Sequence, residues 1–557
     1  MYNFKRLSCL LSAAVIINSC HKAGDILPSA SSVQVADAAT AAFSYGTYTF
    51  TNKSSNKVMQ VTEAGDSMLY DHALLQQNDY TGSGTATSPH QKWIIIPQEK
   101  KLNGYYVYKI MNTASGKYLT SHGNTAGMQL WQYRRDSLYD QLWHILSYRN
   151  AYIIINAGNG LAVVNKNASA QNLTAITQEK FTASNTAAYW NISSIPAESY
   201  RDDDVVNFFH RPKIENTTVA FDQGNSIPLT YGNNNGKTLW VTEDCYTWDE
   251  LKDNGMLNCW FFKYHNSALL QPAGNNWDPV QTPNITTHNS PQSNLEIIAS
   301  PGNHNSTYSW PGVGIEVNNH VYMYCWESRA GTLSPNQVLY DFTENDNGVD
   351  WGTAIRTTPH GMSGQVKVVY SNGMVKPGDG YVYVFGSKGV GLGSNIYLAR
   401  FPQADAQAWQ FWNGTAWDTA LNSTKTAAIT IGSTISAQAN TAVSYVNGKY
   451  VMMSMDLGFF CDPTVHNIYI STSSSPQGPF TAPAIVFTIN DMFYGHLARY
   501  YTPAIHPQFD NGHNELLLTY CLNYSGCAES PCVNGEQDPN FYQVKAVRVP
   551  YSLIGLQ

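Results

Sequence analysis

A unit of three short strands recurs five times after residue 220, and this repeat constrains the fold more than any other feature. Each unit is centred on a strongly apolar strand, and the five are TLWVT, HVYMYC, YVYVFG, KYVMMSM and ELLLTY, beginning at residues 238, 320, 381, 449 and 515. No helical periodicity separates them. Successive antiparallel units of this length are typical of propeller blades. The sequence therefore predicts a five-bladed β-propeller over residues 205–557.

The inner strand of each unit is expected just before its apolar strand. In the first unit it covers residues 226–231, and a Gly/Asn-rich turn at 232–236 leads to the apolar strand. In the third unit the candidate is GQVKVVY, residues 364–370. A third strand follows each apolar strand, and we expect a fourth, outer strand in every blade.

Blade geometry predicts which polar residues gather on one face of the propeller. The inner strand lines the channel and its neighbour runs antiparallel, so the start of one and the end of the other share a face. From the first unit this face receives the acids Asp222, Glu243 and Asp244. The other residues predicted on this face, from all five units, are His265, Asn266, Trp310, Glu327, His360, Asp456, Tyr500, Tyr501 and Asn523.

Carboxylates ringed by aromatic side chains suit hydrolysis of a glycosidic bond. One carboxyl group must stay protonated to protonate the leaving oxygen, while the other stays ionised to attack or to activate water. Aromatic rings pack against the apolar face of a sugar. The alternatives are that these acids cap hairpins or hold a structural Ca²⁺ in the channel. No cofactor is expected.

Residues 43–197 contain an internal threefold repeat. Gln91-Lys92-Trp93 and Gln141-Leu142-Trp143 are two QxW motifs, and Tyr189-Trp190 marks a degenerate third. Two strand signals precede each motif, so the repeat predicts stacked β units with tryptophans in the core. A polar linker is expected at residues 193–204. The predicted fold class is thus all-β, a β-trefoil followed by a propeller.

This QxW spacing resembles a ricin B-type lectin domain, a β-trefoil that usually binds sugars through one shallow pocket in each lobe. The family places an Asp early in the lobe, where this chain has Gln60, Thr120 and Val164. Only the second lobe keeps an aromatic residue. The resemblance therefore predicts a sugar site there, formed by Trp131, Asp140 and Gln141.

The string AFDQGNSIPLTYGNNNGKTLWVTED at residues 220–244 resembles the opening of a family of five-bladed propellers long without known function. HNSALLQ, SWPGVGIEV and IHPQF also match in order. Characterised members are endo-acting D-arabinanases, which implies a furanose polysaccharide as substrate and partner. The family's acid pair falls on Asp222 and Asp244, the implied catalytic residues. Its Gly-Asp-Thr is replaced here by Glu243-Asp244-Cys245, which puts the substrate preference in doubt.

Residues 1–20 form a targeting segment. Lys5 and Arg6 precede an apolar run at 7–17, which is too short to span a bilayer. The ending Ile17-Asn18-Ser19-Cys20 resembles a bacterial lipobox, with Cys20 as the lipidated residue. Residues 21–42 suit a disordered tether. We expect an outer-membrane lipoprotein, held to the membrane by this anchor only; the alternative is secretion.

The net charge and the cysteines limit which partners, disulfides and metal sites we expect. The net charge of -8 offers no basic patch, so nucleic acid is not expected as a partner. Seven of the nine cysteines follow residue 240, an odd number that leaves at least one thiol free. Cys527 and Cys532 form the predicted disulfide. No zinc-ligand spacing is present, so no metal site is predicted. We expect a monomer.

Two functions are compatible with these patterns. The favoured hypothesis is a glycoside hydrolase with a lectin-like accessory module, and the alternative is a surface lipoprotein that binds glycans without cleaving them. Propellers bind ligands in the same central funnel in either case, and a fold does not fix chemistry.

Overall fold

The computed structural model describes residues 42–62, 69–82, 88–259, 262–288, 295–298, 308–329, 332–362, 368–421, 426–461 and 466–557. The predicted signal segment, with Cys20, and the predicted tether up to residue 41 lie outside the described residues. The protein is almost entirely β, with α1 (Asp203–Phe209) as the one α-helix of the described part. No described helix is both long and apolar enough to span a membrane.

The N-terminal module is a β-trefoil built on a closed barrel. Six strands pair in the ring β1–β4–β5–β8–β9–β12, and β12 pairs back with β1. The barrel strands are β1 (Gly46–Asn52), β4 (Trp93–Pro97), β5 (Tyr108–Asn112), β8 (Trp143–Tyr148), β9 (Ala151–Asn156) and β12 (Trp190–Ser194). Three hairpins cap it: β2 (Val58–Val61) with β3 (Leu75–Asn78), β6 (Tyr118–Thr120) with β7 (Trp131–Tyr133), and β10 (Ala162–Asn165) with β11 (Ile176–Glu179).

The three tryptophans of the repeat hold the lobes together. Trp93, Trp143 and Trp190 each show 0% exposure and belong to one core cluster. Their indole Nε1 atoms donate to the backbone oxygens of Met59, Leu119 and Val163, at 3.1, 2.9 and 2.9 Å. The repeated bond confirms the threefold pattern, including its degenerate third copy.

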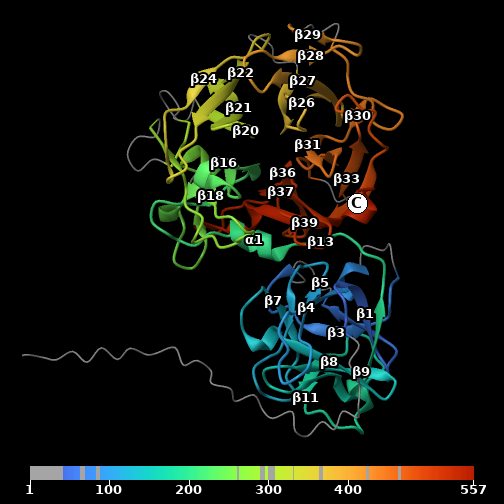
Figure 1. The fold of residues 1–557 in the computed structure, drawn as a ribbon. Coiled ribbons are helices and arrows are strands. Elements are labelled where there is room, and N and C mark those ends of the chain that lie inside the picture. The colour runs from blue at the N-terminus through green and yellow to red at the C-terminus, as the bar shows by residue number, and fades with distance from the viewer. Residues whose placement is uncertain are drawn as a thin grey trace, which may run out of the picture.

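The C-terminal module consists of five antiparallel sheets arranged in a ring (Figure 1). Blade one contains β15 (Asn225–Pro228), β16 (Thr238–Thr247) and β18 (Tyr264–Gln271), with β14 (Thr218–Ala220) on the end of β16. Blade two contains β20 (Tyr308–Val317), β21 (His320–Arg329), β22 (Thr332–Thr343) and β24 (Ile355–Thr357). Blade three contains β25 (Val369–Val375), β26 (Tyr381–Val390), β27 (Gly393–Pro402) and β28 (Gln410–Trp412), with the short β29 (Trp417–Asp418) and β30 (Ser436–Ala437).

Blade four contains β31 (Asn440–Val446), β32 (Lys449–Met455), β33 (His466–Ser473) and β34 (Ala484–Ile489). Blade five contains β36 (His496–His506), β37 (Glu515–Ser525) and β39 (Val544–Pro550), with β35 (Met492–Phe493) beside β36. Two pairs lie outside the blades: β17 (Leu257–Asn258) with β38 (Glu536–Gln537), and β19 (Thr286–Thr287) with β23 (Asp350–Trp351).

The ring closes at both its inner and its outer edge. The inner strands β15, β20, β25, β31 and β36 touch in that order, and β36 contacts β15 again. Apolar side chains of neighbouring blades face each other, as Leu239 of blade one and Val321 of blade two do in a shared cluster. The outer strand of blade five is β13 (Tyr200–Arg201), which pairs with β39 from the N-terminal side of the propeller.

The predicted linker at residues 193–204 is therefore wrong in its second half. Tyr200 and Arg201 complete blade five, and Asp202 caps α1 by accepting a hydrogen bond from the Val205 backbone. The polar side chains of this segment suggested a linker, but they serve a strand edge and a helix cap. The propeller begins at Tyr200.

Most of the predicted inner strand of blade three, residues 364–367, lies outside the described residues. Its end overlaps the observed inner strand β25 (Val369–Val375), which continues beyond the predicted end at Tyr370. Its Ser371-Asn372-Gly373 core looks like a turn in the sequence. A Cβ atom at Gly373 would lie 2.1 Å from the Val443 oxygen of the next inner strand, so the crowded axis requires glycine at this position.

Candidate active site

A cavity of about 290 Å³ opens at the predicted end of the central channel. All five blades contribute to its wall, because each inner strand begins there. The wall includes Gln223, Glu243, Trp310, Tyr324, Ser371, Asn372, Asn440, Thr441, Tyr501 and Thr502. Aromatic rings and polar groups thus alternate around one concave site, which is the form that small-ligand sites usually take.

Asp222 is the most buried of the three acids at this mouth. It is 5% exposed and precedes β15, and its backbone nitrogen donates to the Glu243 oxygen at 3.2 Å. Its Oδ2 accepts a hydrogen bond from the Tyr501 hydroxyl, while its Oδ1 has no partner among the described residues. Burial, followed by repulsion from Asp244, holds the pKa of Asp222 well above its usual range.

Asp244 is turned toward the mouth by an unusual backbone. Its φ of 41° lies in the left-handed region, although Glu243 and Cys245 on either side keep their pairing with β18. Its Oδ1 accepts hydrogen bonds from His265 Nδ1 and from Trp310 Nε1, both at 2.9 Å. Burial raises the pKa of Asp244, and these two donors oppose that rise by favouring the charged form.

Glu243 is the only one of the three acids whose side chain lines the cavity wall. Among the described residues its carboxylate has no hydrogen-bond or salt-bridge partner. Burial, and then repulsion from Asp222 and Asp244, holds its pKa well above the usual range. The site therefore combines two different carboxyl groups. That of Glu243 favours its protonated form, and that of Asp244 accepts hydrogen bonds from two N–H donors that favour its charged form.

Other predicted residues do join this cluster. Asn523 donates from Nδ2 to the Tyr501 hydroxyl at 2.8 Å and so fixes the ring that contacts Asp222. The His265 ring stacks on Tyr308 with centroids 4.1 Å apart, which orients its bond to Asp244.

The predicted residue Tyr500 does not join the cluster. It is fully buried and donates to the Asp456 backbone oxygen instead of facing the cavity.

Four predicted binding residues do not reach the cavity. Asn266 uses its amide on the backbone of Ile298 and Ser309, and Glu327 is fully buried against Arg356, 2.6 Å away. Asp456 accepts from the Asn467 nitrogen and the Tyr469 hydroxyl within blade four. His360 is exposed beside Gln407, whose backbone oxygen accepts its N–H. The side chains of Asn266, Glu327 and Asp456 have structural roles because neighbouring groups of the fold satisfy them, whereas the bond of His360 to Gln407 is made by its backbone.

Two residues were missed by the sequence argument. Tyr542 starts the third strand region of blade five and donates from its hydroxyl to the Asp244 backbone oxygen at 2.9 Å. The rule that placed His265 on this face also applies to Tyr542, so the signal was present. Phe459 follows the second strand of blade four, lines the cavity and lies 5.5 Å from the Tyr501 ring. No local pattern marks Phe459.

Two disulfides fasten the loops around the mouth. The bonds are Cys259–Cys532 and Cys461–Cys527, so the predicted Cys527–Cys532 bridge is wrong. The first joins blade one to the loop after β37, and the second joins that loop to the segment carrying Phe459. The partners lie 273 and 66 residues apart in sequence, so spacing could not reveal them. Cys245, Cys325 and Cys521 are buried and form no disulfide within the described part of the chain.

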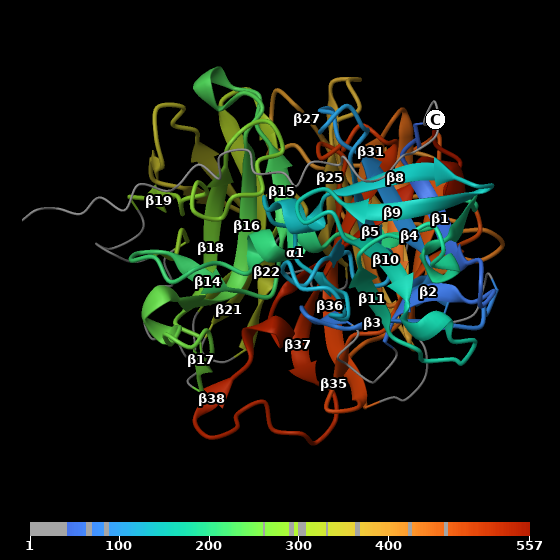
Figure 2. The ribbon, with the colours of Figure 1, turned by 90° about the horizontal axis from the view of Figure 1, so that it is seen from below.

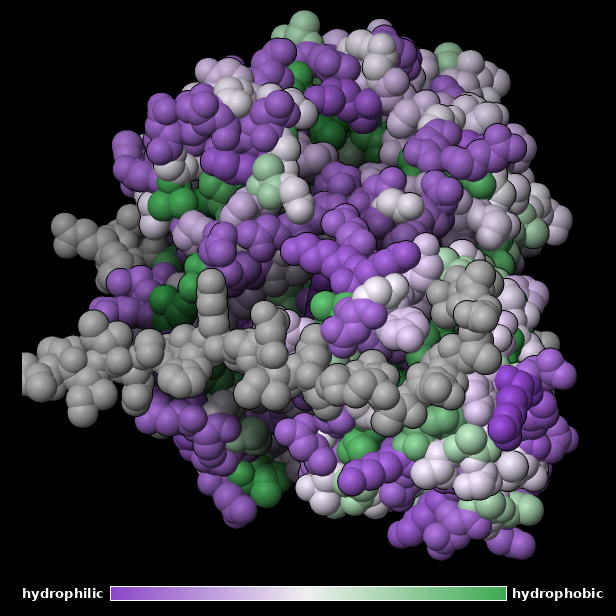
Figure 3. Space-filling view, turned by 60° about the horizontal axis from the view of Figure 1, so that its bottom comes forward, coloured by the Kyte–Doolittle hydropathy of each residue, from purple (hydrophilic) through white to green (hydrophobic). Residues whose placement is uncertain are grey.

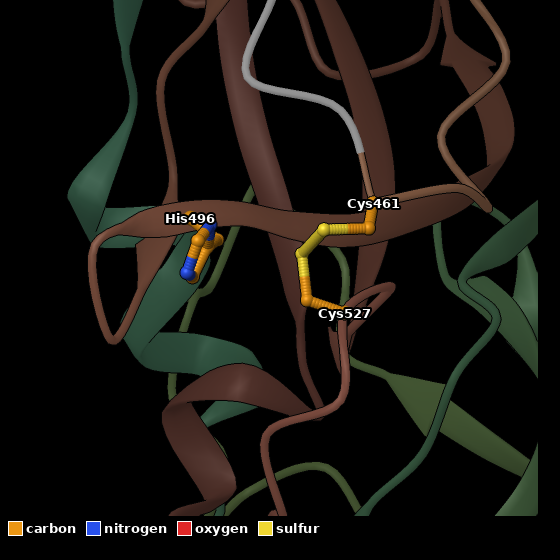
Figure 4. A group of neighbouring side chains, drawn as sticks. All are labelled: Cys461, His496 and Cys527. Carbon is orange, nitrogen blue, oxygen red and sulfur yellow. A yellow bond between two sulfur atoms is a disulfide. The ribbon is translucent and has the colours of Figure 1, made fainter.

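Cys461, His496 and Cys527 form the one described group of three side chains with metal-ligand spacing. Figure 4 shows the two sulfur atoms joined in the disulfide, with the His496 ring beside them. His496 Nε2 lies 3.1 Å from the carboxylate of Glu529. Metal binding needs free thiolates, so this group braces the loop and offers no zinc site.

The propeller module is the part of the chain that matches a family model. Residues 202–549, more than half of the chain, match the family model described as Domain of unknown function (DUF5005). The chain belongs to this family. In this DUF5005 chain the departing residue Cys245 is not part of the cavity wall, and its buried sulfur lies 3.3 Å from Thr242 Oγ1.

The trefoil has its own match. Residues 89–179 match the model described as Ricin-type beta-trefoil lectin domain-like. Similar solved structures include the Rhizoctonia solani agglutinin, at 17% identity over 28% of this chain and 98% of that one, with a TM-score of 0.23. An exo-beta-1,3-galactanase from Clostridium thermocellum is 24% identical over 27% of this chain and 30% of its own, with a TM-score of 0.23. No curated protein matches the chain.

The predicted sugar site of the second trefoil lobe differs from the expectation. Gln141 is fully buried, donates to Arg134 O at 2.7 Å and accepts from Asp136 N at 3.0 Å. The ring of Trp131 is stacked on His122 at 4.0 Å and meets the edge of His72 at 4.4 Å. Asp140 keeps one buried oxygen that has no partner among the described residues. The lobe thus retains an acid but covers its aromatic ring.

Proposed function

We propose that this DUF5005 chain is a glycoside hydrolase that cleaves a furanose-containing polysaccharide, with the chemistry at the mouth of the propeller channel. The observation that carries the proposal is the carboxyl group of Glu243 on the cavity wall, which has no partner among the described residues and lies directly beside Asp244 and near Asp222. Hydrolysis of a glycosidic bond needs two carboxyl groups in different protonation states, and the environments of Glu243 and Asp244 differ in that direction.

In this mechanism Glu243 donates its proton to the glycosidic oxygen. Asp244, whose charged form is favoured by the hydrogen bonds from His265 and Trp310, activates water or attacks the sugar carbon and stabilises the oxocarbenium-like transition state. Asp222 is a positioning residue, because it lies close enough to raise the pKa of Glu243 by repulsion and its Oδ2 orients Tyr501. This assignment keeps Asp244 from the sequence hypothesis and replaces Asp222 with Glu243 as the second catalytic carboxyl group.

Aromatic side chains at the mouth suit the apolar faces of sugar rings. Trp310, Tyr324, Trp326 and Phe459 all line the cavity. Phe459 keeps 43% of its surface exposed, and its neighbour Phe460 keeps 64%. Exposed rings on a loop that a disulfide fastens give a sugar a rigid surface to stack on. The resemblance of residues 220–244 to endo-D-arabinanases favours D-arabinan as the polymer.

The test is an activity screen of the full-length protein on D-arabinan, L-arabinan, arabinogalactan, xylan and levan, with oligosaccharide release read by chromatography. Ladders from D-arabinan support the family's chemistry despite the change at Glu243. Release from another polymer keeps the hydrolase and changes the substrate. Retention on one polymer without release from any overturns the hydrolase in favour of a non-catalytic glycan-binding protein.

We also propose that the protein is a lipoprotein of the bacterial outer membrane, anchored through Cys20. Support comes from the charged start, the apolar run and the Cys that ends it. Labelling cells with a radioactive fatty acid should mark the wild type and leave Cys20→Ala unlabelled. Release of both forms into the medium without label would instead indicate secretion.

A further inference from the structure

The trefoil and the propeller are docked directly, and α1 lies at their junction (Figures 1 and 2). Lys117 of the trefoil reaches Asp203 at 2.9 Å, and Arg135 reaches Asp204 at 2.9 Å. A Cβ atom at Gly116 would lie only 2.4 Å from the Arg201 backbone oxygen, so the backbones touch there. On the other side of the junction, the Tyr45 hydroxyl donates to Glu515 at 3.1 Å. These contacts fix one module against the other.

A cleft of about 210 Å³ opens at this junction. Its wall combines trefoil residues with residues of blade five and of the segment between them, and most of these are polar or charged. The face shown in Figure 3 is likewise mostly hydrophilic, with hydrophobic residues in small separate patches. Pockets for drug-sized ligands usually measure ~300–1,000 Å³, so the cleft suits a single sugar unit.

The charges of the cleft wall do not balance. Its acids are Asp71, Asp203 and Asp491, and its cations are Lys117, Arg134, Arg201 and Lys545. Three of the cations have acid partners: Lys117 pairs with Asp71 and Asp203, Arg134 with Asp71, and Arg201 with Asp491. Within the described residues, Lys545 has only the Gln543 Oε1 atom, at 3.0 Å, and no carboxylate at salt-bridge distance.

The position of the Lys545 ammonium group lowers the stability of the folded chain. Burial lowers the pKa of Lys545 to about 8, and the charges that act on it come from Asp491, Arg201, Asp203 and Asp538. Lys545 therefore still carries its charge at pH 7. A partly buried cation with no carboxylate partner among the described residues destabilises the folded chain, whereas an incoming anion would compensate it.

We propose that this interdomain cleft binds one carboxylate-bearing sugar, a uronic acid unit, through a salt bridge from Lys545. The surplus of one positive charge matches one carboxylate. Tyr70 and Phe541 offer rings for the sugar face, and Asn207 and Asn490 offer amide groups for its hydroxyls. The site lies outside the channel mouth, and it does not depend on hydrolysis. The trefoil thus contributes to sugar binding through the wall it shares with the propeller.

The test is calorimetry of the full-length protein with glucuronic acid, galacturonic acid, glucose, acetate and inorganic phosphate at pH 7. We expect the two uronic acids to bind and glucose to bind at least tenfold more weakly. Lys545→Met should lose at least tenfold in affinity for uronic acids, and Lys545→Arg should keep it. The control is Lys213→Met, an exposed lysine paired with Asp253, which should bind as the wild type does.

Several outcomes of these measurements would overturn the proposal. Equal binding of glucose and uronic acids would remove the role of the carboxylate. Acetate or phosphate binding as tightly as the uronic acids would show an anion site without sugar recognition. Lys545→Met should fold and melt at or above the wild-type temperature, because an apolar chain of similar length replaces an unpaired charge. Binding that persists in Lys545→Met would also contradict the assignment.

A pH series adds a readout that a purely structural role would not give. Since Lys545 loses its proton near pH 8, uronic acid binding should weaken as the pH rises from 7 to 9. Lys545→Arg, whose guanidinium stays charged, should bind evenly over the same range. An equal decline in both proteins would place the titrating group elsewhere and contradict the role of Lys545.

Discussion

The second trefoil lobe and the mouth of the propeller channel contain similar residue types but use them differently. In the lobe, the amide of Gln141 is fully hydrogen-bonded and His122 covers the Trp131 ring. At the mouth, Glu243 faces the cavity without a partner among the described residues and Phe459 keeps an open face. The comparison teaches that unused hydrogen-bonding capacity beside a cavity, rather than residue type, distinguishes a site from scaffold.

The largest expected effect comes from the acids at the mouth. Glu243→Gln and Asp244→Asn should each lower kcat by about 10²–10⁴-fold, the range for losing a general acid or base. Steady-state rates on the polymer found in the screen measure this. Asp253→Asn, at an exposed carboxylate paired with Lys213, is the matched control and should keep full activity. A Glu243→Gln variant with wild-type kcat would return the second catalytic role to Asp222.

The trefoil lobe should respond in stability instead. Gln141→Ala leaves several buried groups unsatisfied, each worth about 1–3 kcal/mol, so the free energy of unfolding should fall by roughly 3 kcal/mol. Urea denaturation monitored by tryptophan fluorescence measures the change. Gln281→Ala, at an exposed glutamine, should have little effect. If Gln141→Ala kept full stability but lost polysaccharide binding, Gln141 would be a ligand after all.

The buried acid at the mouth should make stability depend on pH. The folded-state pKa of Asp222 is raised, so its stabilising contribution is complete below the unfolded pKa and is lost as pH rises through the folded pKa. Asp222→Asn cannot ionise and avoids this loss, which amounts to ~1.4 kcal/mol for every tenfold difference between the folded and unfolded acid dissociation constants. The melting temperature of the variant minus that of wild type should increase from pH 4 to pH 8. A flat difference would contradict the raised pKa.

The open aromatic ring should contribute to substrate binding more than to chemistry. Phe459→Ala removes a stacking surface worth about 1 kcal/mol, so KM should rise roughly fivefold with kcat nearly unchanged. Breaking the Cys461–Cys527 bond with a Cys461→Ser and Cys527→Ser pair should raise KM in the same direction, since the bridge fixes this loop. A fall in kcat alone would instead give Phe459 a role in the transition state.

The smallest effect is expected at the covered ring. Trp131→Ala should change retention on the polysaccharide less than twofold, because His122 and His72 already occupy the sides of the ring. Affinity electrophoresis compares it with wild type and with Phe459→Ala. Strong loss of retention in Trp131→Ala would restore the lectin site of the second lobe and remove the contrast between the two regions.

Much of the fold could be predicted because its signals are local. The tryptophans Trp93, Trp143 and Trp190 repeat at regular spacing, and each indole bonds to the hairpin just before it. The apolar centre strands were each found at their places in the blades. The continuation of the inner strand β25 beyond Tyr370 was not predicted, because its Ser-Asn-Gly core serves the crowded channel and looks like a turn.

The candidate site was predictable only in part. The strand-end rule placed Asp222, Glu243, Asp244, Tyr501 and Asn523 on one face, and the structure brings them together. The same rule also selected Asn266 and Glu327, which the fold satisfies internally. A rule about strand ends gives the face of a sheet, but it contains no information on which hydrogen bonds are already made.

The sequence by itself determined the two modules, their order and the end of the channel where acids collect, since strand periodicity and repeat spacing are properties of neighbouring residues. Only the tertiary structure decided the disulfide between Cys259 and Cys532, the closure of blade five by Tyr200–Arg201 and the unpaired charge of Lys545 at the junction within the described part of the chain. These features depend on residues far apart in the chain, so burial and pairing in space had to be known first.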